Sequence, residues 1–411
     1  MKLLHFSDIH IGMENYAKLD PETGLSSRLL DFFKTFDFIV ETAIKEGVDA
    51  VVFAGDAYKT RDPNPTQQRG FGERIKKLAN ADIPTVLVVG NHDTPNAEGR
   101  ANTLDIYSAL EIDQVWVSRK VELLNIPTKS GNLQIVTLPW LHKNDYKTVG
   151  EKLKSLYDKI KPDSPAIFLS HCEVEGSEYG SEKGLAIGSD VTIPLSLLQD
   201  KRLSYVALGH IHKHQVLSKN PLIVYSGSPQ RIDFGEEKEE KGICLVEITP
   251  SVIPAKAGIY TNGSRINSRR EGVLSGMTSY NVTFQFIPTN ARKFLTITID
   301  LNPTDTDPTS SVLVEIKKHD IKDAIVRVII AIPADLDQSL EIDQIKKSLK
   351  DANVIAGISR NVERRKRYVI DGQSEVERLT PVEALQKYFQ AKKYSPEKMK
   401  KLSEFAKRLF E

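Results

Sequence analysis

The strongest constraint on the fold is an alternation of short apolar runs with longer amphipathic segments in the first half of the chain. The apolar runs have the length of buried strands, whereas Ser27–Glu46 repeats its apolar residues at helical spacing. A second helix is predicted from Pro65 to Asn80, with a proline at its start. Strands that alternate with helices predict a layered α/β domain. The predicted strands are Lys2–Ser7, Asp49–Ala54, Thr85–Val89, Leu133–Leu138, Ala166–Ser170, Ser204–Leu208, Leu222–Ser226 and Gly242–Glu247.

The composition excludes several classes of protein. The 411 residues include 56 Lys and Arg against 55 Asp and Glu, and 40% are hydrophobic. This balance is typical of a globular protein with sizeable cores, and it excludes an acidic disordered tail and a uniformly basic nucleic-acid coat. Two cysteines cannot form a disulfide framework, and no apolar run reaches the ~18 residues of a membrane span. The N-terminus also lacks the apolar region of a signal peptide, so we expect a cytoplasmic protein.

Four regions are predicted along the chain. Residues 1–248 form the α/β domain, and residues 249–281 are an insertion or linker rich in Gly, Ser and Asn, with a basic DNA-touching loop as the alternative. Residues 282–372 carry the strand and helix signals of a small α+β domain. Residues 373–411 contain a capping box at Thr380–Glu383 and a second helix start at Pro396. These helices either fold back on their own domain or bind a partner.

Polar residues that can bind metal ions directly follow several predicted strands. The carboxyl ends of strands in an open α/β sheet are where ligand sites assemble, so these distant residues are expected to converge. Their mixture of carboxylates, an amide and imidazoles suits Mn²⁺, Fe²⁺ or Zn²⁺ better than an all-oxygen Mg²⁺ site. The blocks are Asp8-Ile9-His10, Gly55-Asp56, Gly90-Asn91-His92-Asp93, Ser170-His171 and Gly209-His210-Ile211-His212.

These residue types predict a site for two metal ions. A carboxylate has two oxygens and can bridge two ions, and Asp56 is the natural candidate. Two ions ~3.5–4 Å apart can stabilise the attacking and leaving oxygens of a phosphoryl displacement. His92, beside Asp93, has the chemistry to protonate the leaving alkoxide. Glycines precede Asp56, Asn91 and His210, and we expect them to permit sharp turns there.

The ordered pattern D-x-H, G-D, G-N-H-D, H and G-H-x-H resembles the signature of the calcineurin-like metallophosphoesterases. The segments LLHFSDIHIG, GDAYKTRDPNPTQQRGF and YSGSPQRIDFGE look more narrowly like the SbcD family, the nuclease subunits of SbcCD DNA-repair complexes. The resemblance implies a layered β-sandwich flanked by helices, followed by a small α+β capping domain and C-terminal helices. The insertion before residue 282 is not part of that pattern.

The resemblance also implies roles for individual residues. One metal would be held by Asp8, His10, Asp56 and His212, and the second by Asp56, Asn91, His171 and His210. His92 would be the transition-state stabiliser or general acid, with Asp93 orienting it. The implied cofactors are two divalent ions, Mn²⁺ first, with Mg²⁺, Fe²⁺ or Zn²⁺ as alternatives. The implied activity is cleavage of DNA phosphodiesters, exonucleolytic on ends and endonucleolytic on single strands or hairpins, in the processing and repair of DNA breaks.

The same resemblance implies partners. An SbcC-type, SMC-like ATPase would bind the C-terminal helices, and the nuclease would form a homodimer within a heterotetramer through helices near residues 65–110. Candidate DNA contacts follow the bridging aspartate, although a solvated helix face is the alternative for this basic stretch. These candidates are Lys59, Arg61, Asn64 and Arg69, followed by Gln67, Arg74, Lys76 and Lys77. A second basic run, Arg360–Arg367, would face either DNA or the partner subunit.

One residue departs from the family pattern. Many relatives have a histidine three residues after the bridging aspartate, where it supports exonuclease action, and this chain has Lys59 there. A lysine can contact a phosphate but cannot act as a neutral imidazole. This difference favours endonuclease cleavage over exonuclease action.

Two other functions remain as alternatives. A phosphoesterase acting on nucleotides or phosphoproteins would share the metal site, but it gives no reason for a capping domain and terminal helices. A non-catalytic scaffold of the ATPase would be expected to have lost ligands, whereas every ligand position is filled. Outside the motif, His5 and Cys172 are predicted to be core residues.

Overall fold

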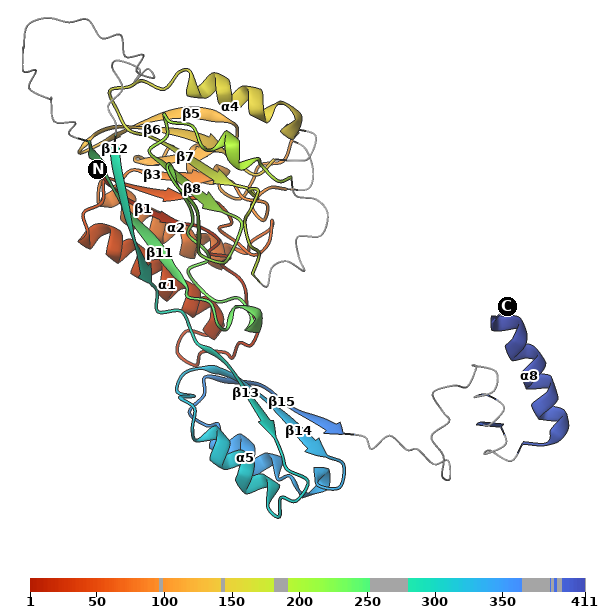
Figure 1. The fold of residues 1–411 in the computed structure, drawn as a ribbon. Coiled ribbons are helices and arrows are strands. Elements are labelled where there is room, and N and C mark those ends of the chain that lie inside the picture. The colour runs from red at the N-terminus through yellow and green to blue at the C-terminus, as the bar shows by residue number, and fades with distance from the viewer. Residues whose placement is uncertain are drawn as a thin grey trace, which may run out of the picture.

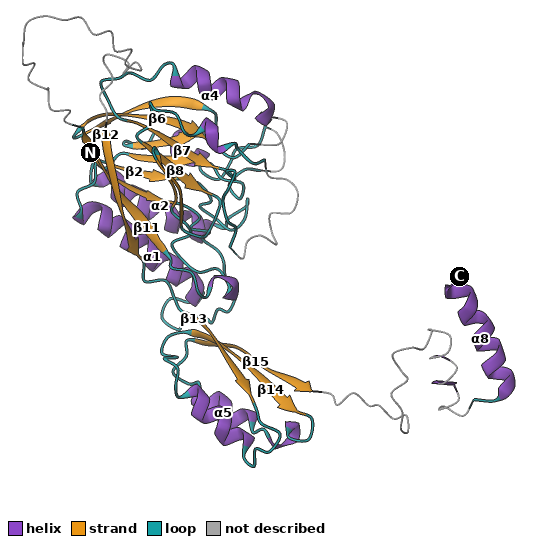
Figure 2. Ribbon diagram, in the orientation of Figure 1, coloured by secondary structure: helices purple, strands orange, loops and turns teal. Residues whose placement is uncertain are grey.

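Two large sheets and one small sheet, flanked by helices, form the described part of the chain (Figures 1 and 2). The computed structural model describes residues 1–95, 99–141, 145–180, 191–251, 280–363, 385, 388–389 and 394–410. The predicted capping box at Thr380–Glu383, most of the predicted insertion and residues 364–367 of the basic run lie outside these ranges. The α/β class, with a sandwich of sheets flanked by helices, is as predicted.

The first large sheet has the strand order β12-β11-β1-β2-β3-β4. Strands β1 to β4 are parallel, and β11 lies antiparallel to β1. Two helices, α1 (Ser27–Lys45) and α2 (Pro65–Asn80), share a core with one face of this sheet. The strands are β1 (Lys2–Phe6), β2 (Ala50–Phe53), β3 (Thr85–Val88), β4 (Val115–Ser118), β11 (Gly242–Pro250) and β12 (Tyr280–Pro288).

The second large sheet has the order β5-β6-β7-β8-β10-β9. Its four central strands are parallel, and β5 and β9 are antiparallel edges. Helix α4 (Val149–Tyr157) packs on its outer face, while a separate apolar core joins the two sheets. The strands are β5 (Glu122–Thr128), β6 (Gly131–Leu138), β7 (Ala166–His171), β8 (Tyr205–Gly209), β9 (Gln215–Lys219) and β10 (Leu222–Tyr225).

Strand β12 corrects the predicted boundary of the second domain. We expected residues from 282 onward to belong to the small α+β domain, but β12 pairs antiparallel with β11 along its whole length, from Gly242↔Pro288 to Pro250↔Tyr280. The alternating pattern of β12 predicts a half-buried strand and does not specify which sheet it joins. The long connection between the two strands adds little entropic cost to their pairing.

The small unit therefore begins after β12. It contains a fully parallel sheet in the order β13-β14-β15, with its own apolar core against two helices. Its elements are β13 (Phe294–Asp300), α5 (Pro308–Ile316), β14 (Ile325–Pro333), α6 (Ile342–Ser348) and β15 (Val354–Glu363). Beyond it, helix α8 (Pro396–Phe410) begins at the predicted proline.

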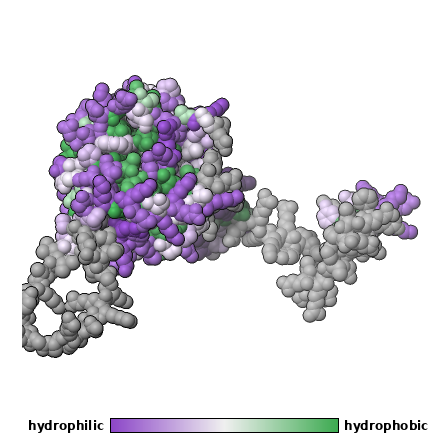
Figure 3. Space-filling model, turned by 90° about the horizontal axis from the view of Figure 1, so that it is seen from above, coloured by the Kyte–Doolittle hydropathy of each residue, from purple (hydrophilic) through white to green (hydrophobic). Residues whose placement is uncertain are grey.

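Shorter elements also occur within the described residues. They are α3 (Asp105–Ala109) and one-turn 3₁₀ helices at Asp145–Thr148 (η1), Leu195–Leu197 (η3), Phe234–Glu236 (η4) and Asp337–Ser339 (η5). The face seen in Figure 3 is mostly hydrophilic, with hydrophobic residues gathered in a few patches. Within the described ranges, no helix combines the length and apolar character needed to cross a membrane.

We predict that a side chain on the buried face of α1 contributes more to the free energy of unfolding than one on the exposed face. Ile39 is fully buried, whereas Ile44 on the same helix is 47% exposed. Replacing a buried isoleucine by alanine removes apolar contacts and leaves a cavity, so Ile39→Ala is expected to lower the free energy of unfolding by ~2–5 kcal/mol. Ile44→Ala should change it by less than about 1 kcal/mol. Urea unfolding of both variants measures the difference, and equal losses would contradict the assigned packing of α1.

Candidate metal centre

The seven predicted ligand residues come together at the carboxyl ends of strands from both large sheets. Asp8 and His10 follow β1, Asp56 follows β2, and Asn91 follows β3. From the second sheet, His171 ends β7, and His210 and His212 follow β8. Parallel strands deliver the residues that follow them to one edge, which explains how distant positions in the sequence converge.

Four of these residues have a left-handed backbone that non-glycine residues rarely adopt. Their φ angles are 52° for Asp8, 46° for His10, 61° for Asp56 and 97° for His210. Each such conformation costs about 1–3 kcal/mol and persists only where the surrounding structure imposes it. Neighbouring loops impose it here, because the N–H of Asp8 donates to the carbonyl of Gly55 at 2.9 Å and that of His10 to the carbonyl of Asp56 at 3.2 Å. Such concentrated strain is typical of functional sites.

The glycines of the motif have two different roles. Gly55 has a φ of +93°, which agrees with the predicted sharp turn before Asp56. Gly90 instead allows the Asp56 carboxylate to approach the backbone closely, because a Cβ at Gly90 would lie 2.1 Å from Oδ1 of Asp56. The turn explanation is therefore incomplete at Gly90, where space for the neighbouring carboxylate is the constraint.

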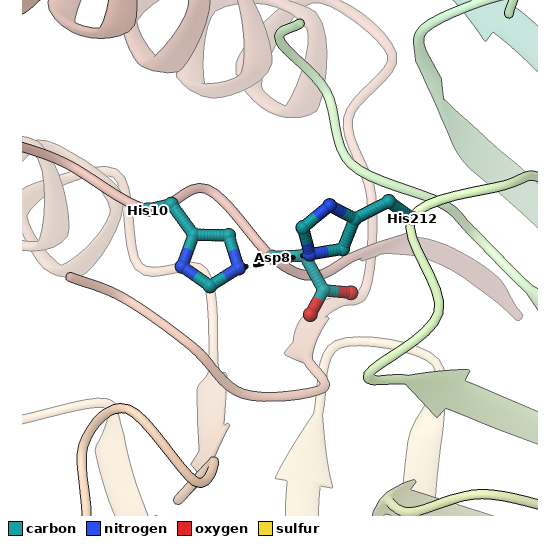
Figure 4. A group of neighbouring side chains, drawn as sticks. All are labelled: Asp8, His10 and His212. Carbon is teal, nitrogen blue, oxygen red and sulfur yellow. Dashed lines mark hydrogen bonds between the residues drawn. The ribbon is translucent and has the colours of Figure 1, made fainter. Parts of the chain in front are cut away.

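One group of candidate ligands consists of Asp8, His10 and His212 (Figure 4). Their candidate ligand atoms all lie within 4.8 Å of one another, and all three residues are buried. The imidazoles of His10 and His212 face each other with 3.0 Å between their Nε2 atoms, and the Asp8 carboxylate lies beside them. The carboxylate of Asp8 also accepts the backbone N–H of His210 at 3.1 Å.

A second group surrounds Asn91. Its Oδ1 lies 2.9 Å from Nε2 of His171 and 3.3 Å from Nδ1 of His210. Oδ2 of Asp56 lies 3.4 Å from Nε2 of His171 and 3.6 Å from Nε2 of His10. Asp56 therefore contacts one imidazole from each group, which is the position required of a bridging ligand.

Hydrogen bonds on the outer side of two imidazoles determine which nitrogen faces the centre. The carbonyl of Ala54 can only accept, so Nδ1 of His171 donates a proton to it at 2.7 Å, and Nε2 faces Asp56, with a free lone pair once the ring is neutral. Glu236 fixes His212 in the same way, with Oε1 2.8 Å from Nδ1. Lone pairs that converge in a buried space repel one another unless a proton or a cation lies between them. This mixed oxygen and nitrogen donor set fits divalent metal ions, and the two groups can hold two of them.

The buried charges shift the pKa values of the centre. Burial opposes ionisation of Asp56, but the imidazoles of His171 and His92 hold its pKa well below the usual range. Burial alone would lower the pKa of His171, yet the charges of Asp56 and Asp8 raise it to about 9. Burial lowers the pKa of His10 well below its usual value despite the attraction of Asp56. The charge of Asp56 therefore favours the protonated form of the His171 imidazole.

His92 is oriented by a different group from the predicted one. Its Nδ1 donates to the carbonyl of Lys59 at 2.6 Å, and its ring lies 4.9 Å from that of His10. We expected Asp93 to orient His92, but the carboxylate of Asp93 accepts the backbone N–H groups of Asp56 at 2.9 Å and Gly90 at 3.0 Å. Asp93 thus ties the loops that follow β2 and β3 together, because a buried carboxylate needs several donors.

Sequence reasoning missed two residues beside the centre. Glu236 is fully buried, and its Oε2 lies 3.0 Å from Nζ of the equally buried Lys241. Lys241 also donates to the carbonyl of His212 at 3.2 Å. Glu236 lies within the segment that carries the family resemblance, but no local spacing connects it to His212, 24 residues earlier. Burial of an acidic residue beside a buried lysine is the feature that marks Glu236 and Lys241 as unusual. The sequence does not show this burial, so only the structure identifies the two residues.

The candidate DNA contacts differ in their surroundings. Arg61 donates from Nε to the carbonyl of Asn91 at 3.2 Å, which places it at the edge of the centre. The side chain of Asn64 instead caps α2 by accepting the N–H of Gln67. Arg69 is exposed and lies 3.6 Å from Glu73.

Two further residues of the basic stretch have structural contacts. Arg74 is largely buried, pairs with Asp37 and stacks over the ring of Phe33 at 4.5 Å. Lys77 also pairs with Asp37, at 2.7 Å. These contacts tie α2 to α1, so Arg74 and Lys77 have a structural role that neither the predicted DNA contact nor the solvated-face alternative describes.

The two predicted core residues are buried. His5 is fully buried with Nδ1 2.9 Å from the hydroxyl of Tyr205, and burial lowers its pKa to about 3. Cys172 lies in the apolar core between α4 and the second sheet.

Comparison with known proteins gives the chain a family context. The calcineurin-like phosphoesterase family matches residues 1–214, which contain all seven ligand positions. The DNA double-strand break repair protein Mre11 of Sulfurisphaera tokodaii is 28% identical over 259 residues, covering 61% of this chain and 60% of that protein. The D component of the nuclease SbcCD of Bacillus subtilis is 26% identical over 273 residues, covering 61% and 67%, respectively. Its counterpart in Staphylococcus saprophyticus is 28% identical over 276 residues, covering 62% and 69%.

Solved structures give more distant matches. The protein TT1561 of Thermus thermophilus has a TM-score of 0.36 at 16% identity, covering 59% of this chain and 92% of that one. A dimetal phosphatase from Danio rerio has a TM-score of 0.38 at 11% identity, covering 60% and 92%.

We predict that metal binding releases a proton from His171. Because its pKa is raised to about 9, the ring is protonated near neutral pH and must lose that proton before Nε2 can bind an ion. Mn²⁺ affinity should therefore increase from neutral pH to about 9, with release of about one proton. Calorimetric titration in two buffers of different ionisation enthalpy measures this release.

The matched control for this titration is His319→Gln, which changes a histidine on the small unit and should leave the proton release unchanged. An affinity for Mn²⁺ that does not vary with pH over this range would contradict the assigned state of His171.

Proposed function

This chain belongs to the calcineurin-like phosphoesterase family, and we propose that it is a metal-dependent DNA nuclease that hydrolyses phosphodiester bonds at the centre described above. The observation that carries the proposal is the sharing of Asp56 between two ligand groups, with His92 bonded to Asp56 and its ring beside that of His10. The relatives named as a double-strand break repair protein and as components of a nuclease support DNA as the substrate. End and hairpin processing in the repair of DNA breaks is the process that we infer.

Two Mn²⁺ ions are the cofactors that we propose. Asp8, His10 and His212 would hold one ion, Asn91, His171 and His210 the other, and Asp56 both. Imidazole, carboxylate and amide ligands together suit Mn²⁺. When bound, such a pair of ions activates water and neutralises charge on the phosphodiester.

The protein's own groups supply orientation and a proton. The backbone N–H of His92 donates to Oδ1 of Asp56 at 2.9 Å, which leaves Oδ2 directed toward His10 and His171. The carbonyl of Lys59 accepts the Nδ1 proton of His92 and fixes the ring. Nε2 of the half-buried His92 is then the atom that delivers a proton to the leaving alkoxide.

Basic residues close to the centre are the proposed phosphate contacts. Arg61 lies beside Asn91, and Lys59 lies three residues after Asp56. Arg69 is the outer candidate, exposed on the first turns of α2. Lysine and arginine side chains bind the DNA backbone through its phosphates, independently of base sequence.

The proposed partners are an SbcC-type ATPase and a second copy of this chain. The Bacillus subtilis relative is by name one component of the nuclease SbcCD, which supports a place for this chain in a similar complex. Residues 373–411, including α8, are the proposed ATPase-binding segment, because the sequence of α8 spaces its apolar residues as one helical stripe among Lys and Glu, a pattern that suits a partner groove. The region 65–110 is the proposed dimer contact, where Ile106 is 50% and Leu110 65% exposed.

The nuclease proposal predicts Mn²⁺-dependent cleavage of hairpin and blunt-ended DNA by the chain with its ATPase partner. His92→Ala should lower the cleavage rate by ~10²–10⁴-fold, because the leaving group then lacks its proton donor. Rates are measured on end-labelled DNA with and without Mn²⁺.

Mn²⁺ affinity measured by calorimetry is the control for His92→Ala, and it should stay within about twofold of wild type because His92 is not a proposed ligand. Absence of DNA cleavage with Mn²⁺ and the ATPase, or undiminished cleavage by His92→Ala, would overturn the proposal. Hydrolysis of nucleotides or phosphopeptides without any cleavage of DNA would favour the phosphoesterase alternative.

Lys59→His tests the departure from the family pattern. The variant restores an imidazole near the centre while the backbone contacts of residue 59 with Ile11 and His92 remain. Degradation of duplex ends should rise by about tenfold or more relative to hairpin cleavage, since an imidazole adds acid–base chemistry that lysine lacks. Lys76→His, at an exposed position of α2, is the matched control. A parallel change in both activities, or no change, would contradict the role assigned to this position.

A further inference from the structure

The one-turn helix η4 and the residue after it connect the metal centre to the small three-stranded unit. Within four successive residues, Glu236 contacts the metal-ligand candidate His212, whereas Phe234 and Glu237 contact residues of the small unit. A single short segment therefore carries contacts in two directions. Any movement of η4 changes both sets of contacts.

Toward the centre, Glu236 is held with little freedom. Oε1 accepts the Nδ1 proton of His212 at 2.8 Å, and Oε2 accepts the backbone N–H of Ile232 at 2.9 Å. The buried ammonium of Lys241 lies 3.0 Å from Oε2 and also donates to Ser228 at 2.8 Å. A carboxylate that accepts the outer proton of a ligating histidine fixes the tautomer and the orientation of the ring. Glu236 is thus placed to act on the metal through His212.

Toward the small unit, Glu237 binds the edge strand β13. Its Oε1 accepts the N–H of Thr296 at 2.8 Å and its Oε2 accepts the Thr296 hydroxyl at 2.5 Å. Arg327 of β14 donates to the same hydroxyl oxygen at 3.0 Å and stacks over the ring of Phe234 at 4.2 Å. Phe234 also packs edge-to-face on Phe294, with 5.0 Å between ring centres.

A second contact joins the small unit to α1. Arg292, just before β13, pairs with the buried Asp31 of α1 and donates to the carbonyl of Asp323 at 2.6 Å. The small unit is therefore anchored both to α1 and to η4. The anchor at η4 is the one that reaches a residue of the metal centre.

We propose that Glu236 is a positioning residue for His212, and that docking of the small unit against Phe234 and Glu237 holds Glu236 in place. Metal affinity then depends on a contact between the two units that involves none of the proposed metal ligands. This inference rests on the metal centre of the proposed function. By linkage, metal binding must in turn strengthen the docking of the small unit.

The deciding variant is Thr296→Val in the full-length protein. It removes the hydroxyl that joins Glu237 and Arg327 while keeping the shape of the side chain and the β-branched residue that suits a strand. Thr298→Val makes the same chemical change at an exposed position of the same strand and is the matched control. Mn²⁺ affinity is measured by calorimetry, and folding by thermal unfolding without metal.

Thr296→Val is expected to weaken Mn²⁺ binding by about threefold to tenfold, and Glu236→Gln by about tenfold or more, the range typical of groups that orient a metal ligand. Thr298→Val should bind as wild type does. Equal affinity of Thr296→Val and wild type would overturn the coupling. Failure of the wild-type protein to bind Mn²⁺ would overturn the metal centre itself, and with it this inference.

Hydrogen exchange gives a second measurement on the wild-type protein, which does not require the Glu236→Gln variant to fold. The amide of Thr296 donates to Glu237, so Mn²⁺ should slow its exchange in the wild-type protein by about threefold or more if the coupling is reciprocal. Exchange at this amide that is unchanged by saturating Mn²⁺ would contradict the proposal. Both tests measure binding or exchange directly and do not require a nuclease assay.

Discussion

The position of the Asp56 carboxylate is the constraint on which the rest of the centre depends. One oxygen accepts the N–H of His92, and the other faces His10 from one sheet and His171 from the other. Negative and neutral acceptors cannot remain buried at these distances without a proton or cation between them. The two sheets, the strained loops and the buried acceptors are therefore parts of one arrangement that is complete when divalent ions are bound.

The loops tolerate their strain because they hold one another. Asp93 accepts backbone N–H groups from the loops after β2 and β3, and the loop after β1 is bonded to the loop after β2 through Asp8 and Gly55. The centre is thus supported by backbone contacts close to it and by Glu236, whose neighbour Glu237 is bonded to Thr296 of the small unit. A site that is so interconnected can respond to the position of a neighbouring unit.

Much of the fold follows from local patterns. The period of α1, the proline at the start of α2 and the apolar runs of the strands were sufficient to place these elements, because helix and strand signals act over a few residues. The convergence of the candidate ligand residues was also predictable, since each lies at or shortly after the carboxyl end of a strand. The pairing of β12 with β11 was not predictable, and neither was the contact of Glu236 with His212, because both join residues with no regular spacing.

The amino-acid sequence alone determined which chemistry is available: carboxylates, an amide and imidazoles after successive strands of an α/β domain. Tertiary structure decided which of these atoms meet, which imidazole nitrogen faces inward, and that Lys59 rather than Asp93 orients His92. Tertiary structure also decided that β12 completes the first sheet. The physical reason is range: residue type and periodicity act locally, whereas burial, proton position and sheet membership depend on atoms brought together from distant parts of the chain.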